Sequence, residues 1–212
     1  MNVGVLGSGI VARVLASGFL KHGHKIMIGS RDPAKLADWL ADNPAGQSGT
    51  FDETAAFGDI VVLAVKGTAA KDALDLAGSS NIAGKTVIDA TNPIADEAPV
   101  DGVLRFFTNL DESLMEQLQD SFPDANLVKA FSSVSNTRMV DPDMEGGPPT
   151  MFICGNDDAA KATVTDILSQ FGWETADMGV AAAARAIEPL CMLYCIPGFT
   201  KNQWTHAFKV LY

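Results

Sequence analysis

Apolar residues along this chain gather in short continuous runs, separated by longer stretches in which they recur every three or four positions. Unbroken apolar runs such as 3–6 and 60–65 are typical of strands buried on both faces of a parallel sheet, and the longer spacing is typical of amphipathic helices. Strands are predicted at 3–6, 25–29, 49–51, 60–65, 85–89, 126–131, 150–155 and 173–178. The alternation of strands with helices predicts an α/β fold with a doubly wound, mostly parallel sheet.

The helices predicted between these strands include 33–42, 52–57, 68–76 and 157–171, with another that ends before Pro123. After Gly179 an alanine-rich stretch favours a helix over 180–188, and Pro189 is expected to kink or break it. Residues 1–178 are therefore predicted to form one domain. Residues 179–212 are predicted to form a small helical extension that is either the wall of a pocket or a dimer contact.

A glycine-rich turn lies between the first strand and the first helix. Gly7-Ser8-Gly9-Ile10-Val11-Ala12 follows the apolar run directly and opens the helical pattern. Gly7 permits the tight turn, Gly9 lets a pyrophosphate approach the backbone, and Ala12 lets the helix lie close to the sheet. The free N–H groups at the helix N-terminus then face the phosphate. This context predicts a dinucleotide-binding Rossmann domain.

The end of the second strand indicates which dinucleotide is bound. NAD-binding strands usually end in an acidic residue that accepts hydrogen bonds from the ribose, whereas Gly29, Ser30 and Arg31 occupy this region here. A glycine leaves room for a 2′-phosphate, the serine hydroxyl can donate to it, and the guanidinium can grip it. The pattern predicts NADP, with Lys35 as a second cation. Asp32 precedes Pro33 and is assigned to helix capping.

Other predicted contacts follow from the rule that ligands lie over the carboxyl ends of the strands. Val65 and Lys66 follow one strand, and the turn 90–93 follows the next and is expected beside the nicotinamide. The apolar loop around Val103–Phe107 is expected to form a substrate wall together with the helix around Met192. The predicted cofactor-binding residues are Gly7, Ser8, Gly9, Ile10, Val11, Ser30, Arg31, Lys35, Val65, Lys66, Ala90, Thr91, Asn92 and Pro93.

The composition of the chain limits the kinds of binding partner and the cellular location that can be expected. The 26 acidic and 15 basic residues leave a net charge of −11, which disfavours nucleic acid and anionic membranes as partners. No apolar run is long enough for a membrane helix, so a cytoplasmic protein is expected. Cys154, Cys191 and Cys195 form no metal-ligand pattern. Cys191 and Cys195 lie one helical turn apart, which leaves either a redox pair or two core-facing thiols open.

These motifs resemble the NADP-dependent coenzyme F420 reductase family and the reductase domains of the STEAP metalloreductases. The resemblance rests on the glycine turn, residues 29–35, the turn 89–93, the run 129–131 and the segments 187–189 and 207–209. It implies NADPH held through Ser30, Arg31 and Lys35, with a flavin-like acceptor stacked on the nicotinamide. Ser132-Ser133 replaces the Asn-Thr usual in that family, and Lys66 stands where proline is frequent; both departures bear on the acceptor.

The predicted function is hydride transfer between NADP(H) and a flavin-like acceptor such as F420, in a homodimer. Direct hydride transfer needs positioning of two rings more than acid–base groups, and no catalytic residue or metal site is predicted. Two alternatives remain open at this point. One is an NADPH-dependent imine or keto reductase, and the other is a redox sensor that holds NADP without turnover.

Overall fold

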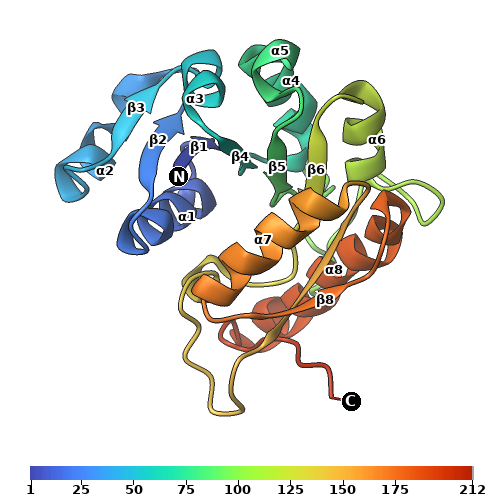
Figure 1. Ribbon diagram of the computed structural model, residues 1–212. Helices are drawn as coiled ribbons and strands as arrows, with labels where there is room; N and C mark the ends of the chain where they lie inside the picture. Colours follow the sequence, from blue (N-terminus) through green and yellow to red (C-terminus); the bar gives the residue numbers. More distant parts are fainter. Residues whose placement is uncertain (212) are drawn as a thin grey trace.

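The computed structural model describes residues 1–211 and contains one eight-stranded sheet in the order β3-β2-β1-β4-β5-β6-β7-β8 (Figure 1). The strands are β1 Asn2–Leu6, β2 Lys25–Gly29, β3 Gln47–Gly49, β4 Ile60–Leu63, β5 Thr86–Asp89, β6 Asn126–Lys129, β7 Thr150–Gly155 and β8 Glu174–Asp177. Strands β1 to β6 run parallel, β7 is antiparallel to β6, and β8 is parallel to β7. The predicted doubly wound, mostly parallel Rossmann sheet is confirmed.

Helices follow the strands in the order expected for crossover connections. The α-helices are α1 Ile10–Lys21, α2 Ala37–Asp42, α3 Phe51–Phe57, α4 Ala70–Ala77, α5 Ser79–Ile82, α6 Leu114–Ser121, α7 Asp158–Gln170 and α8 Ala184–Lys201. Short 3₁₀ turns η1 Pro33–Leu36, η2 Gly67–Ala69, η3 Asn136–Arg138 and η4 Ala181–Ala183 complete the list. Among residues 1–211, no helix combines the length and the apolar character needed to cross a membrane.

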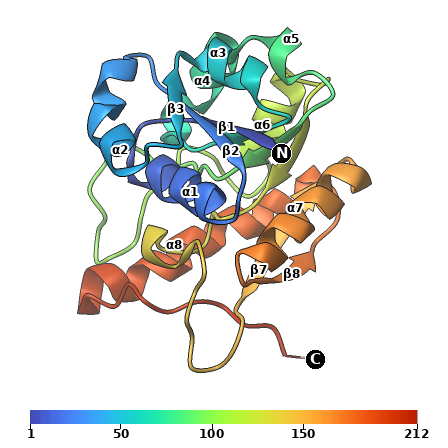
Figure 2. The same ribbon diagram turned by 60° about the vertical axis from the view of Figure 1, so that its left-hand side comes forward.

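Two hydrophobic clusters lie on opposite faces of the sheet. Successive side chains of a strand point to opposite faces, so one strand contributes residues to both clusters. In β4, Ile60 and Val62 belong to one cluster, while Val61 and Leu63 belong to the other. The first cluster includes residues of α1 and α7, and the second includes residues of α3, α4, α6 and the start of α8. Figure 2 shows α1 and α7 on the same side of the sheet. Because both faces are covered, β4 is buried throughout, as its unbroken apolar run predicts.

Two local predictions are wrong, each because another contact prevails, and the helix capping assigned to Asp32 holds for its position only. The predicted strand 49–51 is β3 at Gln47–Gly49, and α3 begins at Phe51 because Thr50 and Glu53 form a capping box. Asp32 stands at the N-cap of η1 but its side chain makes no capping hydrogen bond; its backbone N–H donates to Ser30 Oγ at 3.2 Å.

The third difference is α8, which runs unbroken from Ala184 to Lys201 with Pro189 and Pro197 inside it. A proline removes one helical hydrogen bond, so a break was expected at Pro189. Side chains on both sides of Pro189 are anchored, since Glu188 is 2 % exposed and Tyr194 is 3 % exposed. Tertiary packing therefore outweighs the local cost of the proline.

Candidate functional site

The glycine turn has the geometry expected of a phosphate-binding loop. Gly7 has φ +136°, and a Cβ at this position would overlap the carbonyl of Ala64. Gly9 is the N-cap of α1 and provides no side-chain hydrogen bond to the first turn, and a Cβ on Gly9 would meet no atom within 4 Å. Gly7 is thus required by packing, whereas Gly9 leaves open space in front of unshielded N–H groups. That arrangement fits a pyrophosphate.

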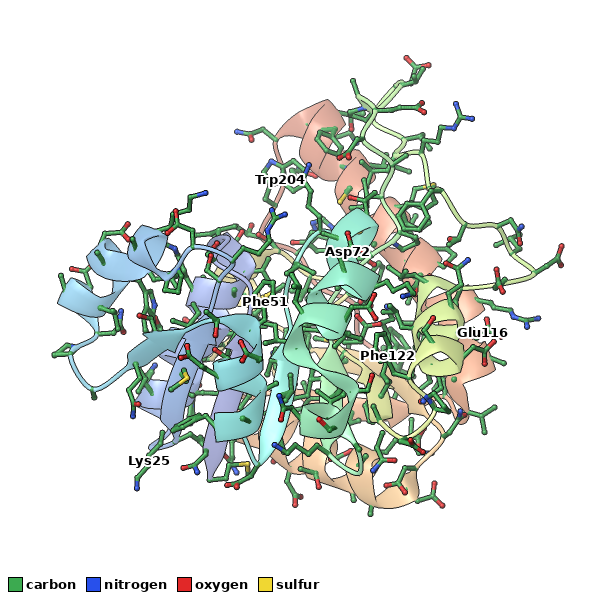
Figure 3. All side chains as sticks on the ribbon, turned by 90° about the horizontal axis from the view of Figure 1, so that it is seen from above. Lys25, Phe51, Asp72, Glu116, Phe122 and Trp204 are labelled. Atoms are coloured by element: carbon green, nitrogen blue, oxygen red, sulfur yellow. The ribbon has the colours of Figure 1, made fainter. Side chains whose placement is uncertain are left out.

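This turn lines a cavity of about 780 Å³, here named the glycine-loop cavity. Its wall includes these predicted cofactor-binding residues: Gly7, Ser8, Gly9, Ile10, Val11, Ser30, Arg31, Lys35, Val65 and Lys66. Phe51 and Asp72, labelled in Figure 3, lie on the same wall. The structure therefore brings together ten of the fourteen predicted residues around one cavity.

The three residues predicted to select the 2′-phosphate differ in how they are held. Ser30 is 5 % exposed, and its Oγ lies 3.5 Å from Ser8 Oγ. Arg31 and Lys35 are exposed and take part in no ion pair among the described residues. Two unneutralised cations beside a buried hydroxyl are a fitting environment for a phosphate group.

Arg13 supports this end of the cavity and is absent from the sequence-based set. Its guanidinium donates to the Ser8 carbonyl at 3.0 Å, to the Lys35 carbonyl at 2.8 Å and to Asp38 Oδ2 at 2.8 Å. The hydrogen bond from Arg13 lowers the pKa of the Asp38 carboxyl. Arg13 thus ties the glycine turn to η1 and α2. Its position one turn into α1 was the only signal, and its partners are not apparent in the sequence.

Two further cavities continue along the carboxyl edge of the sheet. The Thr91 cavity, about 480 Å³, is lined by Val11, Val65, Lys66, Gly67, Ala90, Thr91, Asn92, Ile94, Ala95, Asp96 and Glu97. The Tyr194 cavity, about 450 Å³, is lined by Val11, Ala90, Asn92, Phe131, Ser132, Val134, Ser135, Asn136, Thr137, Met139, Cys191, Tyr194, Cys195 and Trp204. Val11 lines all three cavities, so they meet where α1 begins.

Asn92 stands between the two smaller cavities. Its Nδ2 donates to the Ser132 carbonyl at 2.8 Å, which joins the ends of β5 and β6. Asn92 Oδ1 and Ser132 Oγ are buried without a hydrogen-bond partner. Unpaired buried polar atoms are costly, so a site with one free acceptor and one free hydroxyl fits a ligand that both donates and accepts, as a carboxamide does.

The fourteenth predicted residue, Pro93, is buried and lines none of the three cavities, and its carbonyl accepts from the Phe107 N–H at 2.9 Å. Gly67, which the sequence did not single out, is required instead, because a Cβ there would overlap the Asn92 carbonyl.

The apolar loop lines a cavity of its own with the start of α8, and its role as a substrate wall stays a prediction. Val103, Leu104 and Phe106 enclose a cavity of about 420 Å³ with Pro189 and Met192. This cavity shares no lining residue with the three described above. The loop and the start of α8 thus enclose a separate cavity, although the Phe107 N–H of the loop binds the carbonyl of Pro93, next to Asn92.

The turn after β6 carries backbone strain. Phe131 is 1 % exposed and has φ +60°, a left-handed conformation that costs a bulky residue about 1–2 kcal/mol. Its N–H donates to Met151 Sδ at 3.2 Å. The strained turn leads into Ser132, Val134 and Ser135, which line the Tyr194 cavity. Such outliers concentrate at functional sites.

Behind the Asn92 region lies a buried ionic network that the sequence analysis did not find. Lys129 Nζ lies 2.7 Å from Asp89 Oδ2 and 2.9 Å from Glu188 Oε1, with all three side chains 0–2 % exposed. Burial by itself lowers the pKa of Lys129, but the two carboxylates outweigh burial and raise it to about 12. Lys129 is therefore charged in the folded protein.

The three cysteines are free thiols in different settings. Burial raises the pKa of the Cys154 thiol to about 12. Cys191 is buried and Cys195 is half-buried, and both line the Tyr194 cavity. Contact with the Cys191 thiol lowers the pKa of Cys195, and the same contact raises the pKa of Cys191. Within residues 1–211 no cluster of metal-ligating side chains is present.

Comparisons with known proteins agree with this geometry. Residues 2–93 match the family described as NADP oxidoreductase, coenzyme F420-dependent. The crystal structure of a candidate F420-dependent NADP reductase from Arthrobacter sp. FB24 is 33 % identical, with 99 % of each chain covered and a TM-score of 0.93. The metalloreductase STEAP3 of Rattus norvegicus is 31 % identical over 190 residues, 89 % of this chain.

The protein spans 36 % of the length of STEAP3, so only a part of that metalloreductase is matched. An imine reductase from Aspergillus terreus, solved with NADPH4, is 16 % identical with a TM-score of 0.67, and this chain covers 62 % of it. That likeness shows a shared fold. The family match and the full-length structural relative together establish that this chain belongs to the F420-dependent NADP oxidoreductase family and that its cofactor is NADP.

Proposed function

We propose that this protein transfers a hydride between NADP(H) and a flavin-like ring acceptor such as F420. The main support for this proposal is a row of three cavities that meet at Val11. Arg31 and Lys35 lie at one end of the row, and the unpaired polar atoms of Asn92 and Ser132 lie at the other. A dinucleotide that follows this line has its 2′-phosphate near Arg31 and its nicotinamide beside Asn92.

For this reaction the protein mainly has to position the nicotinamide and the acceptor ring. When bound, NADPH supplies the hydride, and an acceptor ring held about 3–3.5 Å from it needs no covalent help from the protein. The Tyr194 cavity is lined by apolar residues, hydroxyls, amides and thiols, with no charged side chain. Such a wall accommodates a flat, uncharged ring system. We therefore assign the acceptor to the Tyr194 cavity.

The C-terminal extension provides much of that wall. Cys191, Tyr194 and Cys195 lie on α8, and Trp204 follows it. This supports the role of the predicted extension 179–212 as a pocket wall, and the division of the chain at residue 179 stays a prediction. Its last residue lies outside the described range.

The alternative, reduction of an imine or keto group, requires a proton donor beside the hydride. Among the described residues, Tyr194 carries the only phenol on the Tyr194 cavity, and its hydroxyl already donates to the Trp204 carbonyl at 2.7 Å. Burial raises the pKa of Tyr194, which makes proton release harder. Because the Tyr194 hydroxyl already donates to the Trp204 carbonyl, it is poorly placed to protonate a substrate. This favours a ring acceptor that takes its proton from solvent. An imine reductase activity would be abolished in Tyr194→Phe, whereas flavin reduction should persist.

The direct test follows NADPH absorbance at 340 nm with F420, FMN, FAD, ferric chelates, quinones, imines and keto acids in parallel. Rapid oxidation with a ring acceptor supports the proposal. Oxidation with only imines or keto acids would replace it by the alternative, and tight NADPH binding without turnover on any acceptor would favour a sensor.

A cytoplasmic homodimer completes the proposal. Leu193 and Phe199 of α8 are 54 % and 46 % exposed, and Val103 and Leu110 of the loop are 42 % and 75 % exposed. Exposed apolar side chains that lie together are typical of an interaction surface, and we assign that role to α8 and this loop. Light scattering after size exclusion should give twice the 22.3 kDa mass of one chain.

A further inference from the structure

The buried network at Lys129 makes three hydrogen bonds to Thr91, the residue before Asn92. Asp89 Oδ1 accepts the Thr91 N–H at 2.9 Å and the Thr91 hydroxyl at 2.6 Å. Lys129 Nζ donates to the Thr91 carbonyl at 3.0 Å. Every polar group of Thr91 is thus bound by the Asp89–Lys129 pair. The position of Asn92, the next residue, follows from this.

The other end of the network holds helices. Glu188 of α8 accepts the backbone N–H groups of Leu114 and Met115, both at 3.0 Å, at the N-terminus of α6. A carboxylate at this end of a helix is stabilised by the helix dipole. Arg185, one turn earlier on α8, binds Glu116 of α6 at 2.6 Å. Figure 3 shows Glu116 on α6, which neighbours α8. Glu188 therefore fixes α8, the wall of the Tyr194 cavity, against the same lysine.

Folding stability alone is a poor reason for such a network. Replacement of a buried ion pair by well-packed apolar residues is often neutral or stabilising by about 1–4 kcal/mol, because desolvation offsets the attraction. What apolar residues lack is directional bonding to the Thr91 carbonyl, N–H and hydroxyl. The network instead joins two parts of the site: the turn beside the nicotinamide, and the helix beside the acceptor.

We infer that Lys129 is a positioning residue: through Thr91 and Glu188 it holds the nicotinamide-facing turn and the acceptor-facing helix α8 in fixed register. This inference rests on the proposed placement of the nicotinamide beside Asn92. Loss of Lys129 removes the hydrogen bond to the Thr91 carbonyl and leaves Asp89, which accepts the Thr91 N–H and hydroxyl, without its cation. The turn is then held less firmly, and the nicotinamide half of the cofactor is expected to bind more weakly. The phosphate half, held by α1 and the cations after β2, keeps its contacts.

The test compares two ligands by calorimetric titration in Lys129→Met. NADPH has both halves, whereas adenosine 2′,5′-bisphosphate has the 2′-phosphate end and no nicotinamide. We expect NADPH affinity to fall at least tenfold, while affinity for the bisphosphate stays within twofold. NADPH fluorescence on binding, which reports the environment of the ring, should shift toward that of the free cofactor.

Lys161→Met is the matched control. Lys161 is 8 % exposed and is also paired with two carboxylates, at 3.1 Å to Asp158 and 2.9 Å to Asp177, but these partners lie on α7 and β8. Its loss should leave the ratio of the two affinities unchanged. An equal fall for both ligands in Lys129→Met, or no fall for either, would overturn the inference.

If Lys129→Met does not fold, Glu188→Gln serves in its place. The amide keeps the shape and can still accept from α6, but it no longer pairs with Lys129 as a charge. It should lower NADPH affinity selectively and raise the acceptor KM more than it lowers kcat; unchanged ligand ratios would contradict the inference. Failure of wild-type turnover would instead refute the proposed function, because the binding ratios need no acceptor.

Discussion

The two ends of the proposed cofactor cleft are built on different principles. At the proposed phosphate end, the groups available for binding are backbone N–H groups around Gly9 and exposed cations, and these residues all lie between Gly7 and Lys35. At the nicotinamide end, the turn at Thr91 depends on Lys129 and Glu188, from distant parts of the chain. Phosphate binding needs little more than a helix start and charge, whereas ring placement needs a rigid buried frame. Substitutions at the two ends test this contrast.

The largest expected effect is on stability, at the nicotinamide end. Lys129→Met leaves two buried carboxylates without their cation and should destabilise the fold by about 3–5 kcal/mol. Arg31→Ala, at the exposed phosphate end, should change stability by no more than about 0.5 kcal/mol. Urea denaturation of both variants measures the difference. Similar losses in the two variants would remove the contrast between the ends.

Gly9→Val should affect binding and spare the fold. Open space surrounds the Cβ position, so the side chain enters the cleft without a clash and occupies the pyrophosphate site. We expect affinity for NADP(H) and NAD(H) to fall at least a hundredfold, about 2.8 kcal/mol, with an unchanged melting temperature. Gly7→Val is the paired variant, and it should unfold more readily because its Cβ overlaps the Ala64 carbonyl. Retained binding in a folded Gly9→Val protein would show that the turn is only structural.

Cofactor preference should depend on Arg31. We expect NADP(H) to bind at least tenfold more tightly than NAD(H), about 1.4 kcal/mol. Arg31→Ala should erase most of that preference and leave NAD(H) affinity nearly unchanged, since only the 2′-phosphate contact is lost. Titration of both cofactors against both proteins decides this, and equal affinities in the wild type would refute it.

Acid should loosen the nicotinamide end in a defined window. The hydrogen bond from Arg185 lowers the pKa of Glu116 to about 2 from its ordinary value of 4.5. A depressed carboxyl pKa contributes stability above pH 4.5, and that contribution is lost as pH falls from about 4.5 to about 2. Glu116→Gln should therefore show a shallower loss of stability across this window. An identical dependence of stability on pH in wild type and variant would show that the Glu116–Arg185 pair does not contribute to stability.

The smallest effect concerns the thiols of the Tyr194 cavity. Cys195 is half-buried and its pKa is lowered by Cys191, so iodoacetamide should label Cys195 first and leave Cys154 unmodified at pH 7. Cys191→Ala should slow the labelling of Cys195 several-fold. Peptide mass spectrometry gives the order. Preferential labelling of Cys191 would show that this helix face is arranged differently.

Local sequence patterns predicted the sheet and the phosphate end because their causes are local. The apolar run at β4, the glycines of the turn and the residues after β2 each act through neighbours in the chain. The same reasoning misplaced β3 by two residues, because the capping box at Thr50 competes with strand formation. The same reasoning also wrongly predicted a break at Pro189, because the sequence does not show that Glu188 and Tyr194 are buried on either side of it.

The sequence by itself determined the Rossmann fold, the choice of NADP and ten of the residues around the glycine-loop cavity. Only the tertiary structure decided what holds the nicotinamide end. Lys129 stands in a strand and Glu188 on a helix, and nothing in the spacing of either predicts that Lys129 reaches Thr91 or that Glu188 reaches α6. Their pairing exists because β5 and β6 are neighbours in the sheet and α8 packs against α6. A buried charge can be retained only where such folding brings its partners within about 3 Å.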